Sequence, residues 1–330
     1  MTDAGTARLT AALAGAGVSW DRVAGCRSLA GGTFNTVYLV ELADGTGLVV
    51  KIPPAPDTPV LRYEQGILET EALYYRLAGQ CHDVTVPAVI AVDAAGPTDG
   101  YLVMTRCPGS PWPDLVPLPG GAERDELRAE VGRQVARLHT ITGTGFGYPS
   151  QAVGPLRESW RAAFLDMVNA VLADAGKFAV TLPRPAAGIQ DWFTARAAVL
   201  DEVITPVLVH FDLWDGNILV ESGPAGRRIG ALIDAERAFW GDPLAEFVSL
   251  ALFADIEQDT AFLHGYRAAG GTVTFDFAAR RRLSLYRAYL YLIMWVEAAP
   301  RQSSRERRDW LFDRVFRPLT AAFDDGSPHQ

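Results

Sequence analysis

The spacing of apolar residues changes near residue 108, and this change limits the fold class more than any other feature. Before it, short apolar runs alternate with turn residues, and the runs at 37–42 and 48–52 flank an Asp-Gly turn. Such a pattern is typical of a β-hairpin. Pro108, Pro111 and Pro113 then interrupt all periodicity, because proline cannot continue a helix or an inner strand.

The spacing on either side of these prolines predicts two lobes. Further β-like runs lie at 86–92 and 101–105, with one helical pattern at 61–78. After the prolines the apolar positions recur mostly at helical spacing, at 122–141, 156–175, 189–203, 243–254, 256–269, 275–299 and 305–323. We therefore predict an α+β chain with a β-rich N-terminal lobe (1–107) and a larger, mainly helical C-terminal lobe (108–330).

The C-terminal part contains a group of polar residues with a specific spacing. His210, Asp212 and Asn217 form the pattern H-x-D-x-x-x-x-N, and Asp234 ends an apolar run 22 residues after Asp212. Random placement of these residue types would give about 0.003 such patterns in a chain of this composition. In a phosphoryl-transfer loop the Asp accepts the proton of the attacking hydroxyl, and the Asn and a later Asp hold metal ions.

This spacing predicts Asp212 as the catalytic base, and Asn217 and Asp234 as ligands of Mg²⁺. The local sequence bears on both proposed ligands. The run 215–217 is Asp-Gly-Asn, which suits a tight turn whether or not it binds metal. Asp234 follows a buried-looking strand and would otherwise be an uncompensated carboxylate, for which a divalent cation is the natural compensation. Glu236 is equally well explained as a residue near the metal or as an exposed charge.

Two features of the N-terminal part suit nucleotide phosphates. Gly31, Gly32 and Thr33 lie between two predicted strands, and paired glycines let backbone N–H groups approach a phosphate, although such a pair is more often only a turn. Lys51, one of two lysines in the chain, ends an apolar run. We expect it to bind the phosphates with a glutamate partner on the next helix, Glu71 or, failing that, Glu69.

Three further polar residues have mainly structural interpretations. Asp242 precedes Pro243 and is predicted to cap a helix N-terminus. His210 is predicted to brace the catalytic loop through backbone hydrogen bonds, and His139 to be structural.

Charge and apolar runs exclude several kinds of partner. The net charge is −9 without any basic stripe, which argues against nucleic acid and anionic membrane surfaces and fits a cationic small molecule. The longest apolar run, 288–296, is too short to cross a bilayer. Three scattered cysteines and no recognisable signal peptide predict a soluble, cytoplasmic protein.

Together these motifs, from about 25 to 250, resemble the aminoglycoside phosphotransferase family, the small-molecule branch of the protein-kinase-like fold. The resemblance implies ATP and Mg²⁺ as cofactors and transfer of the γ-phosphoryl group to a hydroxyl. It also implies a hinge at 102–109, where the backbone of Thr105 and Cys107 binds adenine and Met104 lies behind the ring. Two positions depart from the family pattern: Phe211 replaces a frequent glycine, and Glu246 a usual aspartate.

The substrate is predicted to contact the helical region after Asp234. Its candidate contacts are acidic residues and one aromatic residue: Asp255, Glu257, Asp259, Glu297 and Trp295. The first expected substrate is an aminoglycoside or similar amine-bearing antibiotic, and the second a metabolite such as an amino sugar, ketosamine, choline-like or homoserine-like compound. A non-catalytic, nucleotide-binding pseudokinase is disfavoured, because no catalytic position is lost. ATP or GTP preference and oligomeric state stay open.

Overall fold

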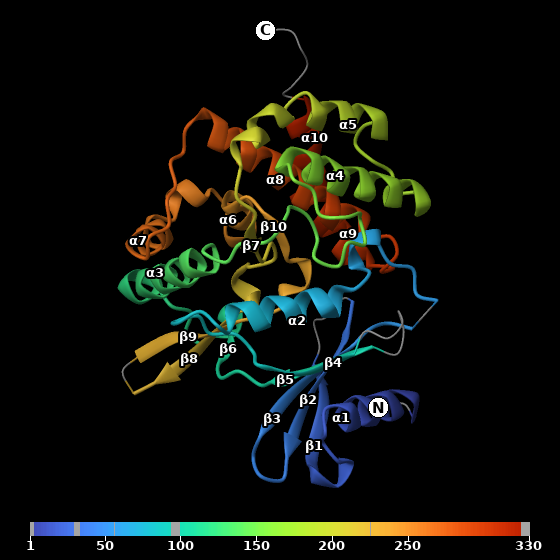
Figure 1. Ribbon diagram of the computed structural model, residues 1–330, viewed down its shortest axis with the longest axis vertical. Helices are drawn as coiled ribbons and strands as arrows, with labels where there is room; N and C mark the ends of the chain where they lie inside the picture. The colour runs from blue at the N-terminus through green and yellow to red at the C-terminus, as the bar shows by residue number, and fades with distance from the viewer. Residues whose placement is uncertain (1–2, 30–33, 56, 94–99, 225, 325–330) are drawn as a thin grey trace.

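A computed structural model of the chain describes residues 3–29, 34–55, 57–93, 100–224 and 226–324 (Figure 1). Its N-terminal part is built on a five-stranded antiparallel sheet with strand order β1-β2-β3-β5-β4. The strands are β1 (Val23–Leu29), β2 (Thr36–Leu42), β3 (Gly47–Ile52), β4 (Val89–Asp93) and β5 (Tyr101–Thr105). The predicted hairpin at 37–52 is formed by β2 and β3.

Two helices flank this sheet. Helix α1 (Asp3–Gly15), which the sequence analysis did not predict, buries Leu9 and Leu13 in an apolar cluster with Val40, Val50 and Val103 of the sheet. Helix α2 (Ile67–Ala78) lies between the sheet and the helical part of the chain (Figure 1).

Helix α2 starts later than predicted. Its N-cap, Gly66, is in the left-handed conformation with φ 73°, which glycine adopts without steric cost. This residue separates α2 from a short 3-10 helix, η2 (Arg62–Glu64), so the predicted continuous helix over 61–78 was wrong at its first turn.

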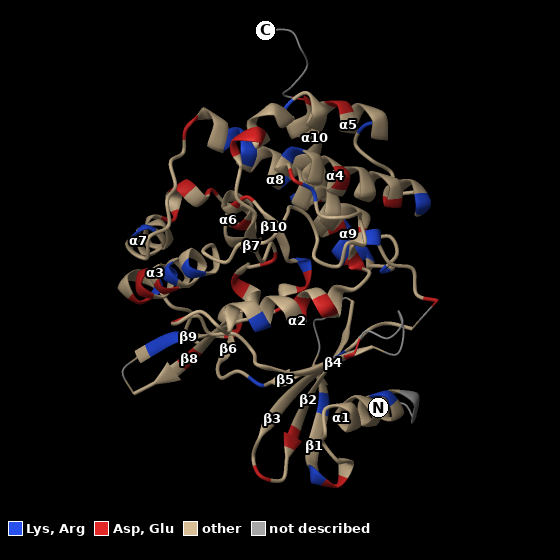
Figure 2. Cartoon of the chain, viewed as in Figure 1, with Lys and Arg blue, Asp and Glu red and all other residues tan. Residues whose placement is uncertain are grey.

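The C-terminal part contains most of the helices. They are α3 (Gly121–Leu138), α4 (Trp160–Lys177), α5 (Ala186–Thr194), α6 (Glu246–Leu250), α7 (Thr260–Ala268), α8 (Phe277–Val296), α9 (Arg305–Leu311) and α10 (Arg317–Asp324). The predicted helix at 189–203 is instead α5 followed by the 3-10 helix η4 (Ala197–Glu202). Figure 2 shows acidic and basic residues interspersed along these helices. In the described ranges, no helix combines the length and apolarity needed to span a membrane.

Two small sheets hold the predicted catalytic loop. Strand β7 (Val207–Val209) pairs with β10 (Phe239–Gly241), and β8 (Ile218–Gly223) pairs with β9 (Gly226–Leu232) and with β6 (Ser110–Pro111). The segment 210–217 therefore connects one strand of each sheet. Its position is fixed at both ends by strand pairing.

One large apolar cluster joins the two parts of the chain. Tyr74 and Leu68 of α2 and Met104 of β5 belong to the same cluster as Phe211 and Phe239. The N-terminal and C-terminal parts are thus packed against each other around α2, on the side where the catalytic loop lies (Figure 1).

Candidate active site

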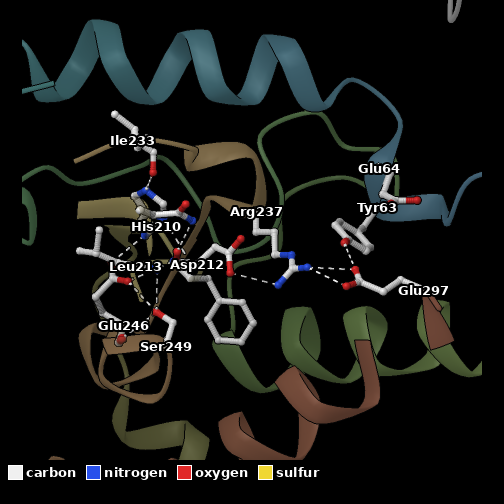
Figure 3. Close-up of polar contacts among 12 residues, drawn as sticks. Tyr63, Glu64, His210, Asp212, Leu213, Ile233, Arg237, Glu246, Ser249 and Glu297 are labelled. Carbon is white, nitrogen blue, oxygen red and sulfur yellow. Dashed lines mark hydrogen bonds and ion pairs between the residues drawn. The ribbon is translucent and has the colours of Figure 1, made fainter. Parts of the chain in front are cut away.

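The first half of the catalytic loop is held by the carboxylate of Glu246, at the start of α6. It accepts hydrogen bonds from the backbone N–H groups of His210 (2.7 Å) and Phe211 (3.1 Å) and from the hydroxyl of Ser249 (3.3 Å). Figure 3 shows Glu246 and Ser249 beside His210. Phe211 has φ 61° and is fully buried against Phe239. A glutamate at this position therefore fixes a backbone conformation that a phenylalanine adopts only under constraint.

Glu246→Ala is expected to destabilise the protein by about 3 kcal/mol or more, because two buried N–H groups lose their acceptor. Denaturant unfolding followed by circular dichroism measures the loss. The exposed Glu158 is the matched control, and Glu158→Ala should stay within about 0.5 kcal/mol of the parent. Equal stability of the two variants would contradict this role of Glu246.

His210 connects the loop to the strand end before Asp234. Its Nε2 lies 2.9 Å from the carbonyl oxygen of Ile233, and its Nδ1 accepts from the N–H of Asp212 at 3.3 Å. Since the carbonyl can only accept, these contacts assign the proton to Nε2 of a neutral ring. Burial lowers the pKa of His210 to about 4. The bracing role predicted for His210 agrees with these contacts.

The carboxylate of Asp212 faces Arg237, three residues after Asp234. Oδ1 of Asp212 lies 3.2 Å from Nη1 of Arg237. Burial raises the pKa of Asp212 to about 7, although the Arg237 charge opposes the shift. A carboxyl with a pKa near neutrality can take up a proton and release it again at physiological pH.

Asn217 lies between Asp212 and the end of β9. Its side-chain Nδ2 donates to the main-chain carbonyl oxygen of Asp212 at 2.7 Å. Its main-chain carbonyl oxygen accepts from the N–H of Ile233 at 2.9 Å. Within the described ranges, Oδ1 of Asn217 has no hydrogen-bond donor.

A chain of buried ion pairs runs from Asp212 toward the N-terminal lobe. Arg237 binds both oxygens of Glu297 (3.0 and 2.9 Å), Glu297 binds Arg301 (3.0 Å), and Arg301 binds Glu64 (2.6 Å). Tyr63 donates to Glu297 at 3.3 Å (Figure 3). Arg237, Arg301 and Glu64 were not predicted from the sequence, because no local pattern marks them.

Lys51 is buried between two carboxylates. Its Nζ lies 2.7 Å from Oε1 of Glu71 and 2.5 Å from Oδ1 of Asp234, so Glu71 and not Glu69 is its partner. Burial alone would lower the pKa of Lys51, but Asp234 and Glu71 raise it above its ordinary value. Tyr75 fixes the geometry, because its hydroxyl donates to Glu71 and accepts from the N–H of Asp234, both at 2.7 Å.

Glu236 joins the same group of carboxylates. Ligand oxygens of Glu71, Asp234 and Glu236 all lie within 4.8 Å of one another. Burial, together with Asp234, raises the pKa of Glu236 well above its ordinary range. Carboxylate oxygens at this separation, with one Lys51 ammonium between them, are the hard donors that Mg²⁺ prefers. The residues present therefore fit a divalent cation, and Glu236 is half-buried among these carboxylates rather than on the exposed surface.

The other predicted nucleotide contacts are placed as follows. Gly31, Gly32 and Thr33 lie outside the described residues. Met104 is buried at 4% exposure, and the N–H of Thr105 donates to Ala88 at 2.9 Å. The Cys107 thiol is half-buried, and burial raises its pKa to about 11, so this side chain is a neutral thiol at physiological pH.

Four of the predicted substrate residues have structural partners of their own. Asp255 caps the 3-10 helix η8 (Ile256–Gln258) and Asp259 caps α7. Glu257 binds Arg280 at 2.8 Å and Asp259 binds Arg128 at 2.7 Å. Trp295 donates to the carbonyl oxygen of Thr181. No contact joins them to Asp212 in the part of the chain that is described; Glu297 alone of the five is linked to Asp212, through Arg237. That these residues bind substrate stays a prediction.

Two smaller predictions concern Asp242 and His139. Asp242 is an N-cap as predicted, since its side chain accepts from the N–H of Leu244 at 2.9 Å. It also binds Tyr286 at 2.7 Å. His139 contacts the hydroxyl of Tyr266 at 2.9 Å, in keeping with a structural role.

A small β-rich lobe, a large helical lobe and this catalytic loop define a protein-kinase-like fold. Solved structures of similar fold include a protein described as a fructosamine-3-kinase from Thermobifida fusca (TM-score 0.67, 22% identity, covering 96% of this chain and 98% of that one). They also include aminoglycoside phosphotransferase APH(4)-Ia with ADP and hygromycin B (0.62, 20%, 96% and 98%) and macrolide 2′-phosphotransferase MphH from Brachybacterium faecium (0.58, 21%, 97% and 99%).

The chain belongs to the phosphotransferase enzyme family, whose sequence model matches residues 25–286. No curated protein matches it in sequence. The predictions of this family and of the two-lobed α+β fold are confirmed.

Proposed function

We propose that this protein transfers the γ-phosphoryl group of ATP to a hydroxyl of a small molecule, with Mg²⁺ as cofactor. The observation that carries the proposal is the connected set of catalytic residues. Lys51 binds Asp234, the N–H of Ile233 binds Asn217, and Asn217 binds Asp212. All four positions that phosphoryl transfer requires are present and in one site, which disfavours a non-catalytic pseudokinase.

Each residue has a separate task in the proposed mechanism. Asp212 orients the substrate hydroxyl and accepts its proton, and Lys51, held by Glu71, positions the phosphates. Asn217 and Asp234, with Glu236 beside them, would hold Mg²⁺, which neutralises charge on the phosphate oxygens when bound. Gly31, Gly32 and Thr33 would cover the phosphates, while Met104 and the backbone of Thr105 and Cys107 would contact adenine.

The first proposed substrate is an aminoglycoside or another amine-bearing antibiotic. The net charge of −9 favours a cationic substrate, and the similar structure of APH(4)-Ia holds hygromycin B. A ketosamine or amino-sugar substrate is the second candidate. It is supported by the similar fold of the protein described as a fructosamine-3-kinase, at a TM-score of 0.67.

A coupled assay of ADP release tests the function directly. Purified protein with ATP and Mg²⁺ is screened against aminoglycosides, macrolides, peptide antibiotics, amino sugars, ketosamines and amino alcohols. Turnover with one class identifies the substrate class. A protein that neither releases ADP with any acceptor nor gains thermal stability from ATP and Mg²⁺ would refute the proposal.

The pH profile of kcat/KM for ATP is expected to fall as pH decreases through about 7. The pKa of Asp212 is raised to about 7, so acid protonates the base and removes activity, and the profile levels off above pH 7. Arg237→Met removes the guanidinium charge that lowers the pKa of Asp212, so the acidic limb of this variant should move to higher pH. Arg237→Lys keeps a positive charge and should preserve the wild-type limb. An identical acidic limb in all three proteins would contradict this assignment.

A further inference from the structure

Asn35 is a buried amide whose contacts are incomplete. It lies directly before β2, its side chain is 6% exposed, and its Nδ2 donates to Oε2 of Glu236 at 3.0 Å. The two residues are 201 positions apart in the chain. The other end of the amide, Oδ1, is enclosed and accepts no hydrogen bond from the residues that the structure describes.

The orientation of this amide follows from its neighbour. Nδ2 donates to Oε2 of Glu236, and a carboxylate that holds a cation only accepts hydrogen bonds, so with a cation bound Nδ2 faces Glu236 and Oδ1 points away. A buried carbonyl oxygen without a donor is unfavourable. Flipping the amide would not satisfy Oδ1, because it would place Oδ1 of Asn35 against Oε2 of Glu236. An amide oxygen in this position can accept a hydrogen bond from a group bound at the site.

The group that Asn35 contacts lacks positive charge. Glu236 shares a cluster with Glu71 and Asp234, whose ligand oxygens lie within 4.8 Å of its own. The ammonium group in direct contact with this cluster is that of Lys51, bound to Glu71 and Asp234. One ammonium would not balance the three carboxylates in their ionised form, and a divalent cation with its water would supply both the missing charge and a donor for an amide oxygen.

We infer that Asn35 is a positioning residue of the cation site. Its Nδ2 holds Glu236 toward Asp234, and its Oδ1 accepts a hydrogen bond from water that the cation carries. This inference rests on the proposed function, which brings Mg²⁺ and nucleotide to the site. The contact between Asn35 and Glu236 links the residue before β2 to the residues after Asp234. The cation therefore also holds the N-terminal sheet to the catalytic residues.

Two substitutions of opposite chemistry test the inference. Asn35→Leu removes both contacts, and Mn²⁺ affinity in the presence of the ATP analogue AMP-PNP is expected to fall about 10–100-fold, the usual cost of losing a residue that orients metal ligands. Asn35→Asp loses the Nδ2 donor to Glu236 but keeps an oxygen and adds a negative charge that attracts the cation. We expect it to lower the melting temperature of the metal-free protein by like-charge repulsion, while Mn²⁺ affinity is kept or increased. Electron paramagnetic resonance of free Mn²⁺ measures affinity, and thermal denaturation checks the fold.

The exposed Asn169 of α4 provides the matched control, and Asn169→Leu should leave Mn²⁺ affinity unchanged. If Asn35 were purely structural, both Asn35 variants would have lower melting temperatures but wild-type Mn²⁺ affinity. This result would overturn the inference about Asn35 and leave the proposed function intact. Failure of the wild-type protein to bind Mn²⁺ with AMP-PNP would overturn the inference and the proposed cation requirement together.

Discussion

Asp212→Asn is expected to lower turnover by about 10²–10⁴-fold, the usual effect of losing a general base. Asparagine keeps the size of the side chain but cannot accept the proton of the substrate hydroxyl. The loss should lie in kcat rather than in nucleotide affinity, because the proposed role of Asp212 is toward the hydroxyl. Asp212→Ala should give a loss of the same order. Steady-state kinetics with the substrate found by the screen measures both parameters.

The melting temperature of Asp212→Asn distinguishes a loss of catalysis from a loss of folding stability. Burial raises the pKa of Asp212, which means that the charged side chain is costly in the folded state. Arg237 keeps its two bonds to Glu297 in the variant. The melting temperature should therefore stay the same or rise.

Asp215, in the same loop, is the matched control for Asp212. Its side chain is 48% exposed and binds Arg128 at 3.3 Å. Asp215→Asn should therefore retain nearly full turnover. Near-normal turnover in Asp212→Asn would refute the assignment of Asp212 as the base.

The elements that could be predicted from the sequence are those whose pattern is local. The hairpin at 37–52 needs only alternation and a Gly-containing turn, and β5 has the predicted limits 101–105. Helix α1 was missed because its alanines and glycines give a weak apolar face. Its burial depends on the sheet that it covers, which is a tertiary effect.

The polar network of the site could be predicted only in part. Residues 210–217 are close in sequence, so their spacing alone predicts a shared role. The Arg237–Glu297 and Asn35–Glu236 contacts join residues 60 and 201 positions apart, so they depend on how the lobes pack. A local signal did exist for Asp255 and Asp259, because each directly precedes a helix whose N–H groups its carboxylate caps.

Asp234→Asn is expected to reduce turnover at least about 10²-fold, since a metal ion contributes several kcal/mol of charge stabilisation in the transition state. Asp234 has φ 66°, a left-handed conformation that asparagine tolerates better than most residues. The backbone should therefore be unchanged. Asparagine retains one oxygen but loses the charge that attracts the cation.

The dependence of the rate on Mg²⁺ concentration distinguishes this variant from Asp212→Asn. Half-maximal activity of Asp234→Asn should require more Mg²⁺ than the wild-type protein, whereas Asp212→Asn should keep the wild-type requirement. Glu71 still holds Lys51 at 2.7 Å, so Lys51 should still position the phosphates. The variant should therefore be impaired only in binding the cation. The exposed Glu69 of the same helix is the control, and Glu69→Gln should change neither rate nor Mg²⁺ requirement. An unchanged Mg²⁺ requirement in Asp234→Asn would show that the cation binds elsewhere.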